Sequence, residues 1–313
     1  MHMAIKCQKG KCQKGKCQKS KRPEEQERRY ALDHTTLAAN CFHHNEKEGT
    51  EQVVLALHGW LDNADSFAEL RKYLPHYSWV CVDLSGHGNS EHRADNCFYH
   101  IWDYVRDIVQ LIKQLNTNVS LVGHSLGGAV AMLVVSVIPE SVQQLIMLDN
   151  VGPFTAQPTE RITKIQGFIR SADRVQNKKK RLYETQEDMI AARMKGFTSL
   201  SRQAASALVM RGSQLKSGSG YHWKHDAKLE VTSPFAMDAA SVDEFAKNIM
   251  CPVLILLAEN GIYQTNKPLV AHRGKHISDL DMIWLPGNHH FHLEAQTAGA
   301  VANKVGDFLH KNR

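Results

Sequence analysis

Short apolar runs alternate with longer polar or amphipathic stretches along most of the chain. The runs are rich in Val, Ile and Leu, are bounded by glycine-rich or polar turns, and have the length of buried strands: residues 52–57, 79–82, 119–122, 144–148, 252–258 and 281–285. Residues 101–115 instead carry apolar side chains at intervals of three and four, which places them on one face of a helix. This alternation predicts an α/β fold whose mostly parallel, doubly wound sheet has helices on both faces.

The parts of the chain near its beginning and its end give less regular predictions. Apolar patches at residues 30–32 and 37–39 interrupt a polar segment and predict early antiparallel strands. We expect a loop after the strand at 252–258, and a final helix over residues 298–310.

The character of the chain changes between residues 154 and 233, where polar and lysine-rich sequence contains no strong strand pattern. Three windows have helical spacing: residues 160–175, 186–194 and 201–211. We interpret residues 154–233 as an inserted helical lid over the carboxyl edge of the sheet, where such a segment shapes a pocket and excludes water. Residues 24–153 and 234–313 then form the α/β core.

Residues 1–23 form a basic segment of a different kind. Three copies of a five-residue unit, KCQKG, KCQKG and KCQKS, occupy residues 6–20, and the first 22 residues hold eight of the 38 Lys and Arg residues and no acid. A repeat of five keeps its cysteines on no single helix face, and no apolar residue anchors the segment, so we expect disorder. The formal charge of +6 therefore arises in this tail, and the nearly neutral remainder does not favour nucleic-acid binding.

The seven cysteines are too few and too scattered for a disulfide scaffold. Cys41, Cys81, Cys97 and Cys251 lie in or beside apolar stretches, so we expect reduced core cysteines and a cytoplasmic protein. The lysine-rich start does not resemble a signal peptide, and no apolar run approaches the roughly 20 residues that span a bilayer. The pattern predicts no particular oligomeric state.

One strand end carries the features of a nucleophilic serine. The strand at 119–122 runs into GHSLG at residues 123–127, and a helix rich in Ala, Val and Leu follows. A serine on such a strand–turn–helix connection has strained backbone angles, and only glycine fits two residues before it and two after it. The Ser125 hydroxyl is then held at the end of the sheet beside a helix N-terminus, which favours developing negative charge.

Four further turns follow strand ends: HGWLDNADSF at 58–67, DLSGHGNS at 83–90, LDNVGP at 148–153 and GNHHFHLE at 287–294. With GHSLGG, in this order and at these separations, they resemble the α/β-hydrolase superfamily and most closely its serine hydrolase-like subgroup. GYHWKHD at residues 220–226 also resembles that subgroup. The resemblance covers the chain from residue 51 onward and implies the α/β-hydrolase fold, hydrolysis without a cofactor and a small-molecule acyl substrate.

The resemblance also implies roles for individual residues. The histidine motif of the family ends in a Leu-Glu pair. When this chain is aligned on that pair, the general base falls at His289, with His290 as the alternative. The backbone amides of Trp60 and Leu126 correspond to the oxyanion hole. Zinc is the competing explanation for close histidines, but two adjacent ones in a loop without a zincin-type carboxylate do not match a zinc site. We therefore expect no metal.

Two residues are candidates for the acid that orients the catalytic histidine. Most members of the family carry an aspartate in the loop after the strand at 252–258, where this chain has Gly261. Some branches of the family place the acid after the strand that follows the helix beginning next to the nucleophilic serine. Asp149 occupies that position at the carboxyl end of the sheet. Asp149 is favoured over Glu259 as the carboxylate that orients the histidine.

These features predict a serine hydrolase that cleaves an ester, thioester or related acyl bond through an acyl-enzyme on Ser125. Two alternatives remain. The same residues support hydrolysis of a carbon–carbon bond, and Gly261 in place of the usual acid is compatible with a non-catalytic, ligand-binding member of the fold.

Overall fold

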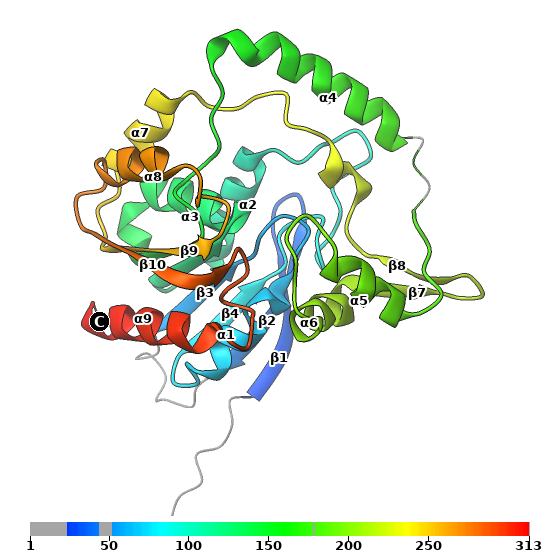
Figure 1. Cartoon of the computed structure of the whole chain (residues 1–313), viewed down its shortest axis with the longest axis horizontal. Helices are drawn as coiled ribbons and strands as arrows, with labels where there is room; N and C mark the ends of the chain where they lie inside the picture. The colour runs from blue at the N-terminus through cyan, green and yellow to red at the C-terminus, as the bar shows by residue number, and fades with distance from the viewer. Residues whose placement is uncertain (1–23, 44–51, 177, 179, 313) are drawn as a thin grey trace, which may run out of the picture.

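The computed structural model describes residues 24–43, 52–176, 178 and 180–312. Its centre is an eight-stranded sheet in the order β1-β2-β4-β3-β5-β6-β9-β10 (Figure 1). The strands are β1 (Glu24–Ala31), β2 (Thr36–His43), β3 (Val53–Leu57), β4 (Ser78–Val82), β5 (Val119–His124), β6 (Val142–Leu148), β9 (Val253–Asn260) and β10 (Leu280–Asn288). Neighbouring strands from β4 to β10 run parallel, and β1 and β2 form an antiparallel edge. The predicted mostly parallel sheet is confirmed, whereas the predictions for residues 1–23 lie outside the described residues.

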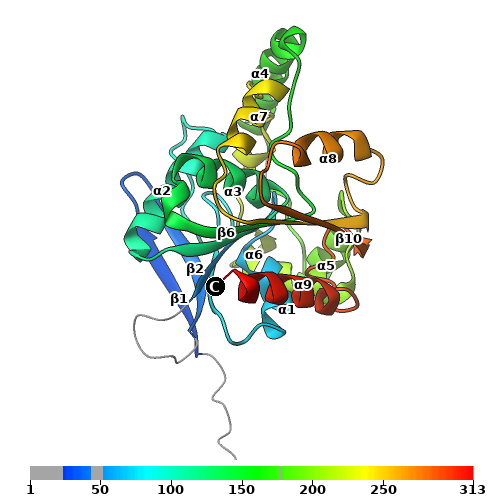
Figure 2. The same cartoon turned by 90° about the vertical axis from the view of Figure 1, so that its left-hand side faces the viewer.

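Helices cover both faces of the sheet, as predicted (Figure 2). One face carries α2 (Ile101–Leu115), α3 (Leu126–Val137), α7 (Ala239–Lys247) and α8 (Lys267–Gly274), and the other carries α1 (Ala68–Lys72) and α9 (Ala298–Lys311). Side chains of β3 alternate between two cores, because Leu55 packs in the cluster of Ile108 and Val54 in the cluster of Val305. Burial on both faces explains why the strands are continuous apolar runs.

Residues 154–233 connect β6 to the second half of the sheet. They form α4 (Arg161–Gln176), α5 (Gln186–Met194) and α6 (Arg202–Gly212), each within one or two residues of its predicted window. Residues 154–233 also contain two short strands that the sequence did not predict, β7 (Ser213–Lys216) and β8 (Gly220–Trp223), which form an antiparallel hairpin. These strands have only four residues each and little burial, so they leave no hydrophobic alternation to detect.

A second element was also missed, because α8 lies within the expected loop after β9. This helix has eight residues and a weak apolar face, although Asn266 caps its first turn by accepting from the Leu269 amide at 3.4 Å. An asparagine before a Lys-Pro pair is a helix-start signal that stronger periodicity elsewhere obscured. Among the described residues, no helix has both the length and the apolar composition needed to cross a membrane.

The cysteine prediction was right for three residues and wrong for one. Cys41, Cys81 and Cys251 are free and buried, and burial raises the pKa of the Cys251 thiol to about 11. Cys97 is free but exposed, because it lies in the connection between β4 and α2 rather than in either element.

A buried ion pair fastens residues 154–233 to the sheet. Arg211 at the end of α6 donates from Nε to both carboxylate oxygens of Asp83, at 3.0 and 2.9 Å, and from Nη1 to Asn40 Oδ1 at 2.9 Å. Asp83 also accepts from the Ala64 amide at 2.7 Å. Because both charges are buried and partnered, the pair fixes the end of α6 beside the carboxyl end of β4 and beside β2.

Candidate active site

Ser125 lies at the junction of β5 and α3, at the carboxyl edge of the sheet. Its backbone angles are φ 50° and ψ −116°, which L residues rarely adopt. A Cβ on Gly123 would lie 2.4 Å from the Gly127 oxygen, and a Cβ on Gly127 would lie 2.0 Å from the Leu57 oxygen. The strand, turn and helix expected around Ser125 are therefore present, and only glycine fits two residues before it and two residues after it.

Asp149 and His289 form a direct hydrogen bond. His289 Nδ1 donates to Asp149 Oδ2 at 2.6 Å. The same carboxylate accepts from the Ile262 amide at 3.1 Å through Oδ2 and from the Ala258 amide at 3.0 Å through Oδ1. Asp149 is fully buried, so these bonds hold it rigidly and orient the imidazole with Nε2 left to exchange a proton.

Position 261 provides the room that this carboxylate occupies. A Cβ on Gly261 would lie 2.3 Å from Asp149 Oδ2 and 2.4 Å from its Oδ1. Glu259, the other candidate acid, is exposed at the end of β9 and has no hydrogen bond to His289. Of the two carboxylates that the sequence left open, the structure brings Asp149 to the histidine.

The residues expected to form an oxyanion hole share a cavity with the serine. Trp60, Leu126, Ser125 and His289 all line it. Within the part of the chain that the structure describes, the backbone amides of Trp60 and Leu126 donate no hydrogen bond. Both amides are therefore available to a ligand oxygen.

Two buried histidines hold the loop that carries Trp60. His87 Nε2 accepts from the Leu61 amide at 3.2 Å, and His58 Nε2 accepts from the Leu84 amide at 3.0 Å. Burial is the main cause that lowers the pKa of His58 to about 4 and that of His87 to about 3. Both rings are therefore neutral near pH 7, as a nitrogen that accepts a hydrogen bond must be.

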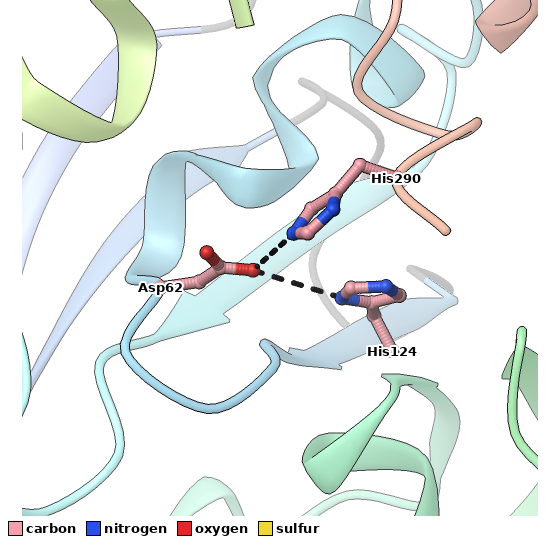
Figure 3. A group of neighbouring side chains, drawn as sticks. All are labelled: Asp62, His124 and His290. Carbon is pink, nitrogen blue, oxygen red and sulfur yellow. Dashed lines mark hydrogen bonds and ion pairs between the residues drawn. The ribbon is translucent and has the colours of Figure 1, made fainter. Parts of the chain in front are cut away.

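A second carboxylate–histidine pair lies beside the first. His290 Nε2 is 3.0 Å from Asp62 Oδ2, and Arg193 of α5 donates to Asp62 Oδ1 at 3.0 Å. Figure 3 shows His124 pointing toward the same carboxylate, with its Nδ1 3.8 Å from Oδ2. The other nitrogen of His290 contacts Thr198 Oγ1 at 3.1 Å, so both ring nitrogens are engaged. This leaves His289, not His290, with a ring nitrogen free for the serine.

Sequence reasoning gave Asp62 and Arg193 no role. Asp62 stands in the turn after a strand, and an acid at the carboxyl end of a strand is a sequence signal that could have been used. Arg193 lies in a polar helix without a motif, so nothing in the sequence indicated its partner.

Burial alone would raise the pKa of Asp62. The neighbouring His290, Arg193 and His124 outweigh burial and hold the pKa of Asp62 well below its usual value. Burial also lowers the pKa of His290.

The Asp62, His124 and His290 ligand atoms lie within 4.8 Å of one another, a spacing that metal ligands also show. The guanidinium of Arg193, however, lies 3.4 Å from His290 Nε2 and already neutralises Asp62. These side chains therefore suit a hydrogen-bonded network with Arg193 better than they suit a bound metal ion.

A further group of metal-ligating side chains lies between α7 and α8. The ligand atoms of Asp243, His272 and His276 are within 4.8 Å of one another. Arg273 donates to Asp243 at 2.6 Å, so this carboxylate too has a cation as its partner. None of these residues lines the cavity of Ser125.

The cavity in front of Ser125 has a volume of about 1250 Å³. Trp60 and Leu126 line it from the core, and Phe154, Phe197 and other apolar side chains line it from residues 154–233. This size and lining suit a ligand with a substantial apolar group.

Comparison with known proteins places the chain among hydrolases. The family model described as alpha/beta hydrolase fold matches residues 52–295. A serine hydrolase-like protein of Dictyostelium discoideum is 29% identical over 277 residues, which cover 84% of this chain and 76% of that protein.

Solved structures agree with this placement. A hypothetical protein from Pseudomonas aeruginosa is 34% identical with a TM-score of 0.83, covering 91% of this chain and 99% of that one. A thioesterase domain from the curacin biosynthetic pathway has a TM-score of 0.73 at 21% identity and covers 90% of this chain and 99% of its own, which is a likeness of fold.

Proposed function

The chain belongs to the alpha/beta hydrolase fold family, and on that premise we propose that it is a serine hydrolase that cleaves an acyl ester or thioester. The observation that carries the proposal is the 2.6 Å bond between His289 Nδ1 and Asp149 Oδ2, in a cavity that also exposes Ser125. An oriented imidazole that shares a cavity with a serine on a strained turn is the arrangement that supports activation of a hydroxyl for acyl transfer.

In the proposed reaction, Ser125 Oγ adds to the substrate carbonyl carbon while its proton passes to His289 Nε2. The Trp60 and Leu126 amides donate to the oxyanion that forms. Collapse of this intermediate breaks the C–O or C–S bond, and the leaving group takes the proton from His289. Water then gives one proton to His289 Nε2 and adds to the acyl carbon. Collapse of this second intermediate breaks the bond to Ser125 Oγ, which takes the proton back from His289, and the acid is released.

Residues 154–233 act in this proposal as the lid that was expected from the sequence. They supply Phe154, Phe197 and Trp223 to the cavity walls, and Trp60 Nε1 donates across the cavity edge to the Leu229 oxygen at 2.9 Å. A wall built over the carboxyl edge of the sheet limits water around the acyl-enzyme and selects the acyl group.

Hydrolysis of p-nitrophenyl butyrate and octanoate tests the proposal. The wild-type protein should turn over both esters, and Ser125→Ala should reduce the rate to background. Ser219→Ala, an exposed serine beyond the cavity lining, is the matched control and should keep the wild-type rate. Turnover by Ser125→Ala at the wild-type rate would overturn the assignment of the nucleophile.

A further inference from the structure

A smaller pocket of about 240 Å³ adjoins the cavity of Ser125. Leu61, Tyr183, Trp223 and His225 line both spaces, so the two pockets lie on either side of these side chains. Leu61 directly follows Trp60, whose amide was assigned to the oxyanion. The side pocket therefore borders the loop that carries Trp60.

The side pocket has a larger share of basic side chains than the cavity beside it, whose much longer lining includes Lys164, Arg170 and Arg193. Lys178, Lys180 and Arg181 line it, and Glu230 is the one acid in its lining. Lys178 Nζ pairs with Glu230 at 2.5 Å, whereas Lys180 and Arg181 form no ion pair with any described residue. The guanidinium of Arg181 lies 4.8 Å from the centre of the Tyr183 ring, which holds it against the pocket wall.

The wall between the two spaces carries an imidazole with no use in the proposed chemistry. His225 stacks near Trp223, with ring centroids 5.9 Å apart, and has no hydrogen-bond partner among the described residues. Burial, aided by neighbouring cations, lowers the pKa of His225 to about 4. The ring is therefore a neutral donor and acceptor at the opening of the basic pocket.

A mostly apolar cavity beside a pocket with two cations that have no ion-pair partner among the described residues fits a ligand with two chemically different ends. We propose that the basic pocket binds a phosphate group on the leaving group of the acyl substrate, while the acyl chain occupies the larger cavity. Phosphate is the anion that lysine and arginine bind together most effectively, and an unpaired cation in a partly enclosed pocket loses little by receiving it. This inference rests on the proposed hydrolase function and specifies its substrate class.

The reaction balances as in the general scheme. Ser125 takes the acyl group, the phosphate-bearing thiol or alcohol leaves with the proton from His289, and water completes hydrolysis. No oxidant or second substrate is required.

Two matched substrate pairs test the proposal. Octanoyl-coenzyme A is compared with the neutral octanoyl-N-acetylcysteamine thioester, and 1-octanoylglycerol 3-phosphate with 1-octanoylglycerol. The ratio of kcat/KM, phosphorylated to neutral, should exceed about ten in at least one pair, and that pair shows whether the phosphate belongs to a nucleotide carrier or a lipid. Ratios near one in both pairs would overturn the proposal.

Side-chain changes then locate the effect. Lys180→Ala and Arg181→Gln should each lower the favoured ratio by about tenfold, mainly through KM, because each removes one charge-assisted contact to phosphate. Lys304→Ala on the exposed side of α9 is the matched control and should leave the ratio unchanged. Unchanged ratios in both pocket variants would contradict the assigned site.

Binding to Ser125→Ala separates this inference from the proposed function. By calorimetry, the affinity of this variant for the favoured phosphorylated substrate should fall at least about tenfold between about 0.05 and about 0.5 M salt, whereas the neutral partner's affinity should not. Suppose that esters are hydrolysed through Ser125, but that the protein neither prefers the phosphorylated substrate nor binds it in a salt-dependent way. The proposed hydrolase function is then supported, and the proposed phosphate subsite is contradicted. If Ser125→Ala hydrolyses esters at the wild-type rate, the proposed function fails, while salt-dependent binding still reports on the pocket.

Discussion

His289 and His290 are adjacent in the chain, yet they pair with carboxylates from different parts of the molecule. Asp149, the partner of His289, is held by backbone amides at the ends of the sheet. Asp62, the partner of His290, is held by side chains, one of them the guanidinium of Arg193 on α5. The same pair of residue types thus produces a rigid orienting group in one case and a link between loops in the other.

The two histidines differ in the hydrogen-bond partner of the ring nitrogen that does not face the carboxylate. His290 uses both nitrogens within the protein, whereas His289 Nε2 has no hydrogen-bond partner among the described residues. A base for the serine needs that free nitrogen. We therefore expect changes at the Asp149 pair to affect rate, and changes at the Asp62 pair to affect stability more than rate.

Asp149→Asn gives the largest expected effect. An amide at this position cannot hold His289 in the Nδ1-protonated form, so kcat for ester hydrolysis should fall by about 10³ to 10⁴. Steady-state kinetics measures the change, and circular dichroism checks that the variant is folded. A variant within tenfold of wild type would exclude Asp149 as the orienting acid.

Gly261→Ala should have the next largest effect. The new Cβ would lie 2.3 Å from Asp149 Oδ2, so the carboxylate must move away from His289. We expect a loss of about 10² in kcat, between that of the acid variant and wild type. Gly299→Ala on α9 is the matched control, since its Cβ would meet ordinary contacts at 3.5 Å. Equal rates for the two variants would contradict the tight fit at position 261.

Asp62→Asn tests the other pair. It leaves His290 and Arg193 beside a neutral amide in a buried position, and breaking such an ion network costs about 3–5 kcal/mol in the free energy of unfolding. The rate of the folded variant should fall only about tenfold, through loosening of the loop that carries Trp60. Urea unfolding and kinetics measure the two effects. A rate loss as large as that of Asp149→Asn with unchanged stability would reverse the roles of the pairs.

Stability should depend on pH through the histidines that hold the same loop. The pKa of His58 is lowered to about 4 and that of His87 to about 3, whereas both are about 6.5 in the unfolded chain. As pH falls below about 6.5, the unfolded chain binds protons that the folded chain does not. The free energy of unfolding should therefore decrease by about 1.4 kcal/mol per pH unit for each histidine until their folded pKa is reached.

Urea titrations at pH 7, 6 and 5 measure this slope. His87→Gln should reduce it, and His310→Gln at the exposed end of α9 should not. A free energy of unfolding that stays constant from pH 7 to 5 would contradict the buried neutral state of these rings.

Glu259→Gln should have the smallest effect. This side chain is exposed and does not contact His289, so kcat should change by no more than about twofold. The variant is also the matched control for Asp149→Asn, because both change an acid to its amide near the end of a strand. A loss of more than about tenfold in kcat would indicate that Glu259 is the acid that orients His289.

Most of the sheet could be predicted because its strands are buried on both faces. The runs at 119–122 and 252–258, for example, are continuous in apolar residues and became β5 and β9. The hairpin β7–β8 and helix α8 escaped prediction because they are short and weakly buried. In such elements tertiary contacts, rather than periodicity, decide the conformation.

For the candidate site, the sequence predicted Ser125 as the nucleophile and His289 as the base, and it left two candidates for the acid. The choice depends on the space at Gly261 and on the Ala258 and Ile262 amides, which only the folded chain brings to Asp149. Asp62 and Arg193 are 131 positions apart, so a pairing between them leaves no local pattern.

Mass spectrometry after reaction with a fluorophosphonate tests the central claim most directly. The wild-type protein should gain one phosphonyl group, located by peptide mapping on Ser125, because the Asp149–His289 pair activates that hydroxyl. Ser125→Ala should gain none, and Asp149→Asn should react about 10³ times more slowly. Modification of Ser125→Ala at the wild-type rate, or of Asp149→Asn as fast as wild type, would contradict the account.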